Sequence, residues 1–525
     1  MNIRKLVSIM LIIATVVLLT LYNYERYLKS FSQSPSDEWS RDIKIGSRDF
    51  NRSTYIFSNN SKIYAVLPKM NKIELIDISN PNKILIKDVD INGIDESNVK
   101  EINYCNGRLY IVKNNMLMSV GIDGSNLVNY GIKVDGFKIV DDKLITFNNS
   151  EINVYKIFID KLMLEGSISQ IKNTKEIDAE KINGRLYIGL LTGINYDRSI
   201  YLLTYESGKW SNLKPVYNVS VSSFSDIENL RIAYDGGIYL FYNTISKNDS
   251  ALKYIYYNDS KMIKVQPKNV AINVDGIGTA DDVGDFDILE SDTNVYVVSS
   301  AGIELTNFGT TPIKSTEIIY SKWKNGKIES SKLATRTGTW AGMPKICSTK
   351  YGNFLTWIES DGFGKYDVYA SSTTYVYKNV LNRVRPIDKQ YALSTLIQRS
   401  AASLLIGLIL VLALSLPAYV LFVIIMLFEP KRLKNDSIFS FYIGTIVYMI
   451  MKYFFYPPHP VKMSLNAVFG PYSLIVMPFI FTLISLGFVK IYYGKGKFNS
   501  NFGAFSFMVI IDAILTNLFY APFFT

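Results

Sequence analysis

A seven-residue phrase, NGRLYIV at residues 106–112, returns almost unchanged as NGRLYIG at residues 183–189. Looser copies share its plan, which is a turn of Asn, Asp, Gly or Ser followed by alternating apolar and aromatic residues; they begin at residues 59, 141, 234, 291 and 351. Successive starts are 35 to 60 residues apart. Because Asn-Gly and Asp-Gly accept the positive φ of tight hairpin turns, each copy predicts a β-hairpin. A chain that repeats one hairpin in this way is restricted to folds built from repeated β units.

The strands around the turns indicate which kind of unit repeats. The strand after each turn carries β-branched and aromatic residues on both faces, as in a strand packed between neighbouring sheets. Repeats of roughly 40 to 60 residues with about four short strands are typical of propeller blades. Residues 50–385 shared among seven units give about 48 residues per unit. The sequence therefore predicts an all-β propeller of about seven blades over residues 45–385, with a β-sandwich or two unrelated β domains as the alternative.

Two stretches also resemble known types of blade. MPKIC and NFLTWIE followed by SDGFGKYDVYASST, within residues 343–373, resemble the neuraminidase-repeat blade, in which a strand ending in Trp precedes a Gly-rich turn. KIELIDISNPNKILIKDVDI, at residues 72–91, resembles surface-protein propeller repeats of the LVIVD kind. These resemblances imply the propeller fold. They imply no particular activity, because propellers host many unrelated functions.

Apolar segments at both ends of the chain predict membrane helices. Residues 6–22 carry no charge and follow two basic residues, which predicts an amino-terminal anchor within residues 1–30; a cleaved signal peptide is the alternative. Four further segments predict a four-helix transmembrane domain over residues 398–525. They are residues 401–428, 438–456, 472–491 and 502–524. FVKIYYGKGKF, at residues 488–498, resembles a loop of the Yip family of multi-span membrane proteins, and we infer no function from that likeness.

The basic residues in excess flank these apolar segments. The net charge is +10, and residues 31–385 account for only +1 of it. This distribution fits membrane topology and argues against nucleic-acid binding. The loops at 429–434 and 490–498 contain more Lys and Arg than residues 452–471, so the positive-inside rule places both in the cytoplasm. With a composition typical of an AT-rich genome, the chain is predicted to be a bacterial multi-pass plasma-membrane protein with a cytoplasmic amino terminus and an external propeller.

The motifs of known enzymes assign no catalytic or cofactor-binding residue. A sialidase-like glycosidase needs three Arg for the substrate carboxylate, a Tyr nucleophile with a Glu partner, and an acidic residue. The propeller region offers Arg108, Arg185, Arg231, Arg336 and Glu359, but the Arg-Ile-Pro and Ser-x-Asp-x-Gly-x-Thr-Trp phrases of that family are missing. Arg108 and Arg185 follow hairpin turns, where a solvated side chain is expected. The sequence favours a protein without catalytic activity.

One acidic stretch and two thiols are the remaining candidates of the propeller region. Asp281, Asp282 and Asp285 could supply oxygen ligands to Ca²⁺, but their spacing matches no EF-hand loop, and a solvated turn is favoured. Cys105 and Cys347 are interpreted as free thiols, with a ring-closing disulfide as the alternative. No metal and no cofactor are predicted.

Asp512 is the unexpected polar residue of the last apolar segment, and Thr516 follows it by one helical turn. An ionisable side chain inside a membrane has to face other helices or water. The pair is interpreted either as a proton, ion or partner-helix site or as a hydrogen bond between helices. We favour the hydrogen bond, because we expect no second charged residue at the same depth.

These observations predict a cell-surface, membrane-anchored propeller that recognises or assembles a ligand without transforming it. A surface with Tyr and turn amides fits a protein or a carbohydrate as the ligand. One alternative is a glycan-acting hydrolase, which would gather paired carboxylates in the central funnel of the propeller. The other is a membrane sensor or transporter subunit that uses the propeller as its sensing domain.

Overall fold

The structure is a computed structural model that describes residues 3–159, 161–211, 215–247, 249–257, 266–291, 294–305, 313–428, 439–456, 472–493 and 500–523. The chain divides into two compact units. Ser34–Leu305 and Lys314–Arg383 form the first unit, which contains every strand. Met1–Gln33 and Val384–Thr525 belong to the second unit, which is helical.

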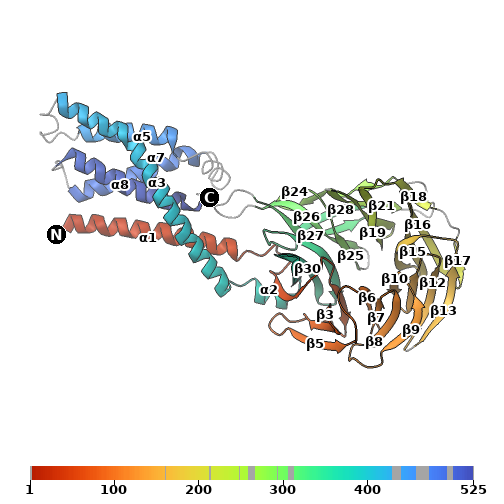
Figure 1. Ribbon diagram of the computed structural model, residues 1–525. Coiled ribbons are helices and arrows are strands. Elements are labelled where there is room, and N and C mark those ends of the chain that lie inside the picture. Colours follow the sequence, from red (N-terminus) through yellow and green to blue (C-terminus); the bar gives the residue numbers. More distant parts are fainter. Residues whose placement is uncertain are drawn as a thin grey trace. The chain divides into compact units, whose positions relative to one another are not determined.

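The first unit is a β-propeller of seven blades, which confirms the predicted fold class. Each blade is an antiparallel sheet whose inner strand contacts the inner strands of the neighbouring blades. Figure 1 shows the blades following one another around the ring in chain order. The inner strands, in ring order, are β2 (Tyr55–Asn59), β6 (Val99–Cys105), β10 (Gly136–Val140), β14 (Thr174–Ile182), β19 (Ser225–Tyr234), β25 (Phe286–Ser291) and β29 (Ala341–Thr349).

The outer strands complete each blade in sequence order. In the first three blades they are β3 (Lys62–Lys69), β4 (Lys72–Asp77) and β5 (Leu85–Asp90); β7 (Arg108–Lys113), β8 (Met116–Gly121) and β9 (Val128–Lys133); and β11 (Lys143–Phe147), β12 (Ile152–Phe158) and β13 (Lys161–Ile168). In the next two they are β15 (Arg185–Ile194), β16 (Asp197–Glu206), β17 (Lys209–Trp210) and β18 (Pro215–Ser220); and β20 (Ile238–Ser246), β21 (Asp249–Tyr257) and β22 (Lys268–Asn269). In the last two they are β26 (Asn294–Leu305), β27 (Ile313–Lys324) and β28 (Lys327–Leu333); and β30 (Gly352–Gly362), β31 (Lys365–Ser372) and β1 (Ile43–Arg48). A separate two-stranded sheet consists of β23 (Ile272–Val274) and β24 (Gly278–Ala280).

The repeated phrases mark one turn of every blade. Each of the seven lies where the inner strand meets the second strand of its blade. Asn106 and Gly107 have φ values of 49° and 81°, and Asn183 and Gly184 repeat them at 50° and 83°. The strand that follows is enclosed on both faces: β7 buries five of its six residues. The prediction of a strand packed between sheets is therefore confirmed.

The last blade is assembled from both ends of the propeller. β1 precedes the first blade in the chain and pairs antiparallel with β31, from Ile43 opposite Ala370 to Arg48 opposite Tyr366. The helix α2 (Tyr375–Leu381) then fastens this blade to the first one, because the buried hydroxyl of Tyr377 donates to the Ile78 carbonyl. The sequence analysis did not foresee β1, since no turn phrase marks it.

Cys105 and Cys347 are free thiols, as the sequence predicted. Cys105 is buried and Cys347 is half-buried. Burial raises the pKa of the Cys347 thiol to about 11, so it stays protonated at neutral pH. The thiols therefore belong to the packing of their blades, and the ring is closed by strand pairing.

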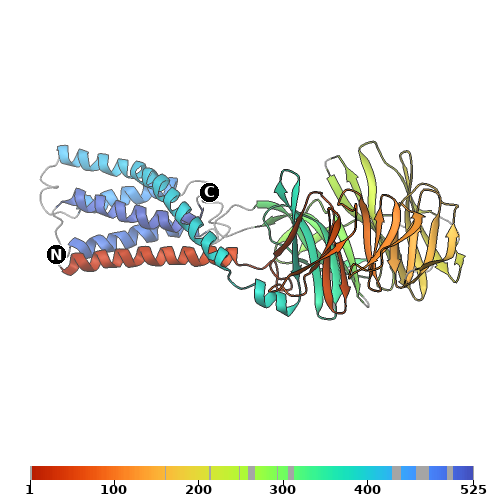
Figure 2. The ribbon, with the colours of Figure 1, turned by 60° about the horizontal axis from the view of Figure 1, so that its bottom comes forward.

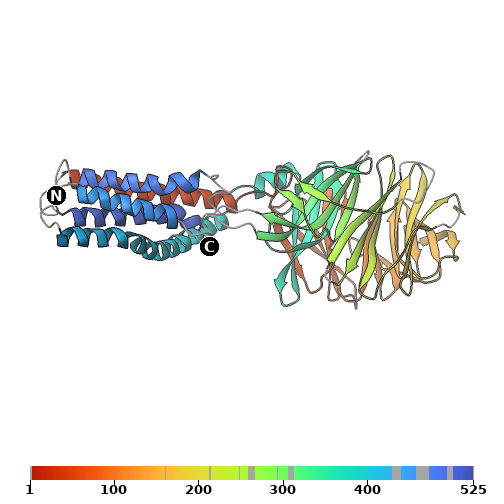
Figure 3. The same ribbon diagram turned by 90° about the horizontal axis from the view of Figure 1, so that it is seen from above.

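Among its described residues the helical unit contains five long helices, and the described part of each apolar segment of the sequence lies in one of them. They are α1 (Ile3–Phe31), α3 (Pro386–Phe428), α5 (Phe439–Phe455), α7 (Ser473–Tyr493) and α8 (Asn501–Tyr520), which continues as the short 3₁₀ turn η1 (Ala521–Phe523). Figures 2 and 3 show the helices lying side by side. Among the described residues, three helices are long and apolar enough to cross a membrane: Ile3–Phe31, Pro386–Ile425 and Asn501–Phe523.

The topology prediction depended on basic residues in the loops between helices. The basic loop at 429–434 and most of the loop at 490–498, which carries the likeness to the Yip family, lie outside the described residues. Lys452, which the prediction assigned to a loop, lies within α5 instead and is buried. It sits one turn before the helix ends, where a basic residue is easily mistaken for a flanking one.

Candidate functional site in the propeller channel

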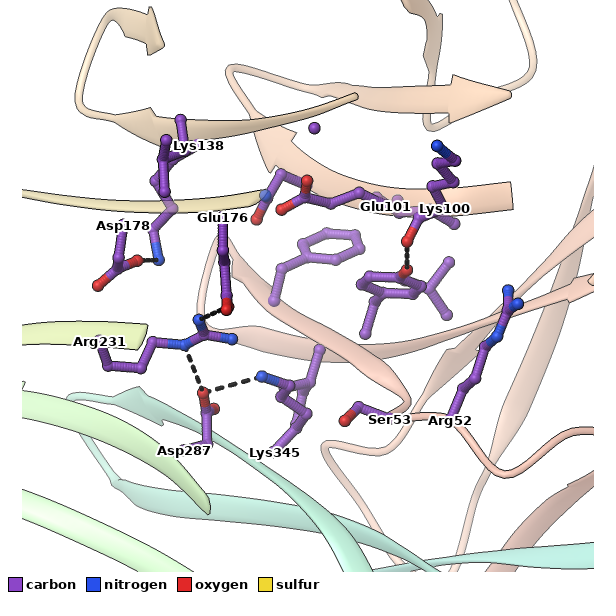
Figure 4. A pocket seen from close by; sticks show the side chains of 18 of the residues that line it. Arg52, Ser53, Lys100, Glu101, Lys138, Glu176, Asp178, Arg231, Asp287 and Lys345 are labelled. Atoms are coloured by element: carbon purple, nitrogen blue, oxygen red, sulfur yellow. Dashed lines mark hydrogen bonds and ion pairs between the residues drawn. The ribbon is translucent and has the colours of Figure 1, made fainter. Parts of the chain in front are cut away.

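A cavity of about 660 Å³ lies at the centre of the propeller, and all seven inner strands contribute to its lining. Its volume falls within the ~300–1,000 Å³ of ordinary ligand pockets. Arg52, Lys100 and Lys175 line the cavity and are exposed, so water reaches it. Figure 4 shows charged side chains projecting into this space from several blades. The cavity is therefore the candidate binding site.

Ion pairs between neighbouring inner strands occupy one side of the cavity. From β10 to β29, cationic and acidic side chains alternate in blade order, as Figure 4 shows. The contacts are Lys138 with Asp178 at 2.6 Å, Arg231 with Glu176 at 3.1 Å and with Asp287 at 3.9 Å, and Lys345 with Asp287 at 2.9 Å. Because each pair joins two blades, these charges hold adjacent inner strands together.

Burial and pairing act in opposite directions on the cations of this cluster. Burial alone lowers the pKa of Lys138, but the neighbouring Asp178 carboxylate outweighs it, and the pKa rises. At Lys345 burial prevails over Asp287 and lowers the pKa. Lys345 is therefore less firmly protonated than Lys138.

The carboxylates of the cavity also satisfy the free edges of the inner strands. An inner strand is the last strand of its sheet, so its outward N–H groups have no strand partner. In three places a carboxylate accepts a hydrogen bond from an N–H on the next inner strand of the ring. The bonds run from Phe137 to Glu101 at 2.9 Å, from Ile232 to Asp178 at 2.8 Å, and from Ile346 to Asp287 at 3.1 Å.

Glu101 lies at a different corner from the ion pairs, beside aromatic side chains. The rings that line the cavity are those of Tyr55, Phe57, Tyr104 and Phe147. Phe57 and Tyr104 stack across two blades with centroids 4.2 Å apart. A Cβ added to Gly136 would lie 2.6 Å from the Phe147 ring and 3.1 Å from Glu101 Oε2, so glycine leaves the space that these two groups occupy. This corner combines a carboxyl group with aromatic surface.

The Glu101 carboxyl titrates close to neutral pH. Burial raises its pKa to about 7, against the lowering effects of the Phe137 N–H, Lys138 and Arg231. Glu176 raises it further. A buried carboxyl with a shifted pKa in a cavity is a candidate for binding or proton transfer.

Two further carboxyl groups, those of Glu180 and Glu290, lie farther along the inner strands β14 and β25. Burial, together with Glu180 on β14, raises the pKa of Glu290 on β25 to about 8. Glu290 accepts a hydrogen bond from the Tyr234 N–H at 2.9 Å. The pKa of Glu180 is also raised, first by burial and then by Asp178. Both carboxyl groups therefore keep their protons to a higher pH than an ordinary glutamate does.

Of the four arginines that the sequence offered for a sialidase-like site, only Arg231 lines the cavity. Arg108 was expected to be solvated, but it is buried, and its guanidinium donates to the Ser119 and Asn126 carbonyls. Arg185 is exposed and pairs with Glu206 at 2.9 Å. Arg336 and Glu359 lie elsewhere in the propeller, outside the cavity lining. The three-arginine site of sialidases is therefore not gathered in this cavity.

The candidate metal ligands also separate. Asp281 and Asp282 are exposed and pair with Lys314 at 3.5 and 3.3 Å. Asp285 accepts a weak hydrogen bond from the Met343 N–H at 3.4 Å. Within the part of the chain that the structure describes, no three His, Cys, Asp or Glu side chains are grouped as metal ligands.

A second polar cluster lies inside the helical unit, around Asp512. Its carboxylate accepts hydrogen bonds from Lys452 Nζ at 2.7 and 2.9 Å and from the Tyr448 hydroxyl at 2.5 Å. The Thr482 and Thr516 hydroxyls lie 3.1 and 3.3 Å from the same carboxylate. The expectation that no second charge lies at this depth was wrong, because Lys452 from α5 pairs with Asp512 from α8.

Sequence reasoning missed most charges of the cavity, although a signal was present. The inner strands alternate apolar and charged residues, as in VKEINYC at 99–105 and TKEIDAEKI at 174–182. These strands are the ones that precede the repeated turn phrases. Charged residues upstream of each phrase would therefore have pointed to the channel.

Comparisons with known proteins assign no family to this chain. No protein-family model matches the chain. No curated protein matches it either, so the resemblances to neuraminidase, LVIVD and Yip sequences stay predictions. Among solved structures the chain is similar to the N-terminal domain of Nup159 (12% identity, 65% of this chain and 97% of that chain, TM-score 0.39). It is also similar to the AfRom2 CNH domain (12%, 63% and 98%, TM-score 0.36) and to polysaccharide lyase Uly1 (10%, 66% and 95%, TM-score 0.31). These low scores carry no function to this chain.

Proposed function

We propose that this chain is a membrane-anchored recognition protein whose propeller binds a ligand in its central cavity without transforming it. The propeller fold is consistent with a recognition or interaction role. The apolar helices on either side of the propeller in the sequence support the anchor. On this proposal the protein resides in a bacterial plasma membrane, with the propeller outside and the ligand drawn from surface proteins or carbohydrates.

The observation that carries the proposal is the solvent-accessible cavity to which seven separate blades contribute. Propeller blades surround a central channel, and apolar side chains would line it at lower cost than buried ion pairs do. This channel instead keeps about 660 Å³ open and surrounds it with charged and aromatic groups. Such a mixture of polar groups and aromatic surface is the usual lining of a binding pocket.

The location is tested by fractionating cells that express the full chain. The protein should remain with the membrane after alkaline extraction. Protease added to intact spheroplasts should degrade the propeller, and it should leave the loop at 429–434 inaccessible until the membrane is permeabilised. Release of the chain by alkali, or protection of the propeller, would contradict the anchor or the orientation.

Recognition is tested by screening the full chain, in lipid nanodiscs, against surface glycans and surface proteins. A ligand of the cavity should bind the wild type and lose at least tenfold in affinity when Arg231 becomes Met. The matched control is Lys322→Ala, because Lys322 pairs with Glu329 on outer strands, away from the cavity. Ligands that bind both variants like the wild type would place recognition elsewhere.

Glycan hydrolysis is the second candidate, because the cavity does contain several carboxyl groups. Glu101, with its pKa raised to about 7, stays partly protonated, while Glu176 and Asp287 are paired with Arg231. Carboxyl groups in such unlike environments can divide into an acid and a base or nucleophile. Reducing-end release from surface polysaccharides, abolished by Glu101→Gln, would support an enzyme. Binding without release of sugars would leave recognition as the function.

A further inference from the structure

Glu101 is built into the channel like two other carboxylates but lacks their cation. Glu101, Asp178 and Asp287 each accept an N–H of the next inner strand. Asp178 also pairs with Lys138, and Asp287 with Lys345. Among the described residues, Glu101 has no ion pair. Its Oε2 takes the Phe137 N–H, which leaves Oε1 available to a ligand.

The alternation of charge breaks at the strand next to Glu101. Going round the ring, β6 carries Glu101, and the following strands supply charges up to Lys345 on β29. β2, which stands between β29 and β6, lines the cavity with Tyr55, Ile56 and Phe57 and with no charged residue. The strand beside Glu101 therefore offers it aromatic surface and no cation, although Arg52, just before β2, also lines the cavity.

The surroundings of Glu101 suit a cation on a ligand. Tyr104 and Phe147 line the same cavity, and the Phe147 ring adjoins the Glu101 carboxyl at Gly136. The Tyr55 hydroxyl donates to the Lys100 carbonyl at 2.9 Å, which fixes that ring. Aromatic faces attract cations, and the attraction strengthens where water is excluded.

The charges that act on Glu101 come from four strands. Lys138 on β10 and Arg231 on β19 favour its ionised form, and Glu176 on β14 opposes it. On β2, Tyr55 lies close enough for Glu101 to raise the pKa of its phenol, after burial. Arg52, Lys100, Lys175 and Asp135 also line the cavity, so the whole lining holds six cationic and five acidic side chains. A cationic ligand would therefore be attracted by the unpaired Glu101 carboxylate and not by the net charge of the cavity.

We propose that this corner of the cavity binds the ammonium group of an amine-bearing ligand, held between Glu101 and the rings of Tyr55, Tyr104 and Phe147. The assignment rests on the proposed recognition function and specifies its ligand. Two kinds of molecule present such a group to a surface protein: an amino sugar and a lysine side chain. Their common chemistry is a primary ammonium on a flexible or polar carrier, and the experiment separates the two sources.

The binding assay uses the full chain in nanodiscs and isothermal titration calorimetry with three probes. These are a glucosamine tetramer, the neutral N-acetylglucosamine tetramer of the same length, and tri-lysine. One of the two amine probes should bind at least tenfold more tightly than the neutral tetramer. If the glucosamine tetramer binds more tightly, the source is a sugar, and if tri-lysine does, it is a peptide.

The pH dependence identifies the carboxyl group that is responsible. Because burial raises the pKa of Glu101 to about 7, the carboxylate that holds the ammonium disappears as the pH falls. For tri-lysine, affinity should therefore fall about fiftyfold between pH 7 and pH 5. Tri-lysine stays charged throughout this range, so its own titration does not contribute. The glucosamine amines gain protons over the same range, so the affinity of that tetramer should fall less.

Two variants complete the test. Glu101→Gln retains an oxygen for the Phe137 N–H but removes the charge, so it should lose the preference for amines and the pH dependence. Tyr104→Leu removes one ring and keeps the charge, so affinity should fall several-fold with the pH dependence intact. Thermal unfolding confirms that each variant is folded, and Lys322→Ala should bind like the wild type.

Three results would overturn the proposal. The first is equal binding of neutral and amine tetramers in both the wild type and Glu101→Gln, which would leave recognition in the cavity standing. The second is amine binding without the loss at pH 5. The third is no binding of any probe while the screen finds a cavity ligand without an amine. Failure of the recognition function itself would appear differently, as an absence of any ligand sensitive to Arg231→Met.

Discussion

The propeller channel and the helical unit both contain lysine–carboxylate pairs, but only one of the two places is open. In the channel, Lys345 and Arg231 keep about a fifth of their surface exposed beside the cavity. In the helical unit, Lys452 and Asp512 are 1% and 0% exposed. The open pairs can therefore exchange partners with water or a ligand, whereas the closed pair keeps its partners within the helical unit.

The closed pair is satisfied from several helices at once. Asp512 from α8 accepts from Lys452 and Tyr448 of α5, and Thr482 of α7 lies within hydrogen-bonding distance of both charged groups. We therefore interpret the pair as a device that fixes α5, α7 and α8 in one arrangement.

The largest predicted effect follows from breaking that pair. Lys452→Met leaves the Asp512 carboxylate buried without a cation, which should destabilise the helical unit by about 3–5 kcal/mol. Denaturation of the full chain in mixed micelles, followed by helical circular dichroism, measures this loss. The double variant Lys452→Met/Asp512→Leu removes both charges and should recover more than half of it. If Lys452→Met is as stable as the wild type, the pair does not hold the helices together.

A further variant, Asp512→Asn, separates a packing role of the cluster from a role in transport or sensing. Asp512→Asn keeps the shape of the side chain and removes its charge. If the cluster were a proton or ion site, this variant would change function while its unfolding stayed like that of the wild type. On the packing interpretation its stability falls, and ligand binding by the propeller does not change.

A smaller effect is predicted for the open site. Arg231→Met removes the cation that contacts Glu176 and Asp287, but water in the cavity can solvate the carboxylates left behind. The loss should therefore be about 1–3 kcal/mol, measured by thermal unfolding of the propeller from its β circular dichroism. A loss as large as that of Lys452→Met would mean that the channel pairs are no more accessible than the helical pair.

Alkaline pH should reveal the raised pKa of Glu290. Burial and Glu180 raise the pKa of Glu290 to about 8 in the folded chain, whereas an unfolded glutamate ionises near ~4.3. The folded state holds this proton more tightly, so it loses stability as the pH rises from about 4 through 8. Glu290→Gln should therefore stabilise the propeller clearly at pH 9 and much less at pH 5. Equal effects at both pH values would exclude titration of Glu290 as the cause.

The sequence was sufficient for the fold because the turns are local. Asn106 with Gly107 and Asn183 with Gly184 fix positive-φ hairpins by their own chemistry, and their repetition counts the blades. β1 could not be found in this way. It pairs with β31, more than 300 residues later in the chain, and nothing in its six residues announces that partner.

The charged sites were harder to predict because their partners are distant in the sequence. Lys138 could pair with any acidic residue of a neighbouring inner strand, and only the register of the ring brings it to Asp178. Lys452 and Asp512 are 60 residues apart, and Lys452 lies near a helix end, where basic residues commonly reach toward the interface. Asp512 itself was recognisable, since an acidic residue in an apolar helix always requires a partner.

The smallest effect is predicted for a pair that is neither buried nor beside the cavity. Lys322 on β27 contacts Glu329 on β28 at 2.8 Å, and their side chains are 35% and 39% exposed. Lys322→Ala should cost at most about 0.5 kcal/mol in the same thermal unfolding experiment, because water replaces the lost partner on both sides. Together with Arg231→Met and Lys452→Met, it forms a series in which burial increases and the chemistry stays the same. If Lys322→Ala costs as much as Arg231→Met, burial does not set the strength of these pairs, and the distinction between an open channel and a closed helical cluster has no energetic basis.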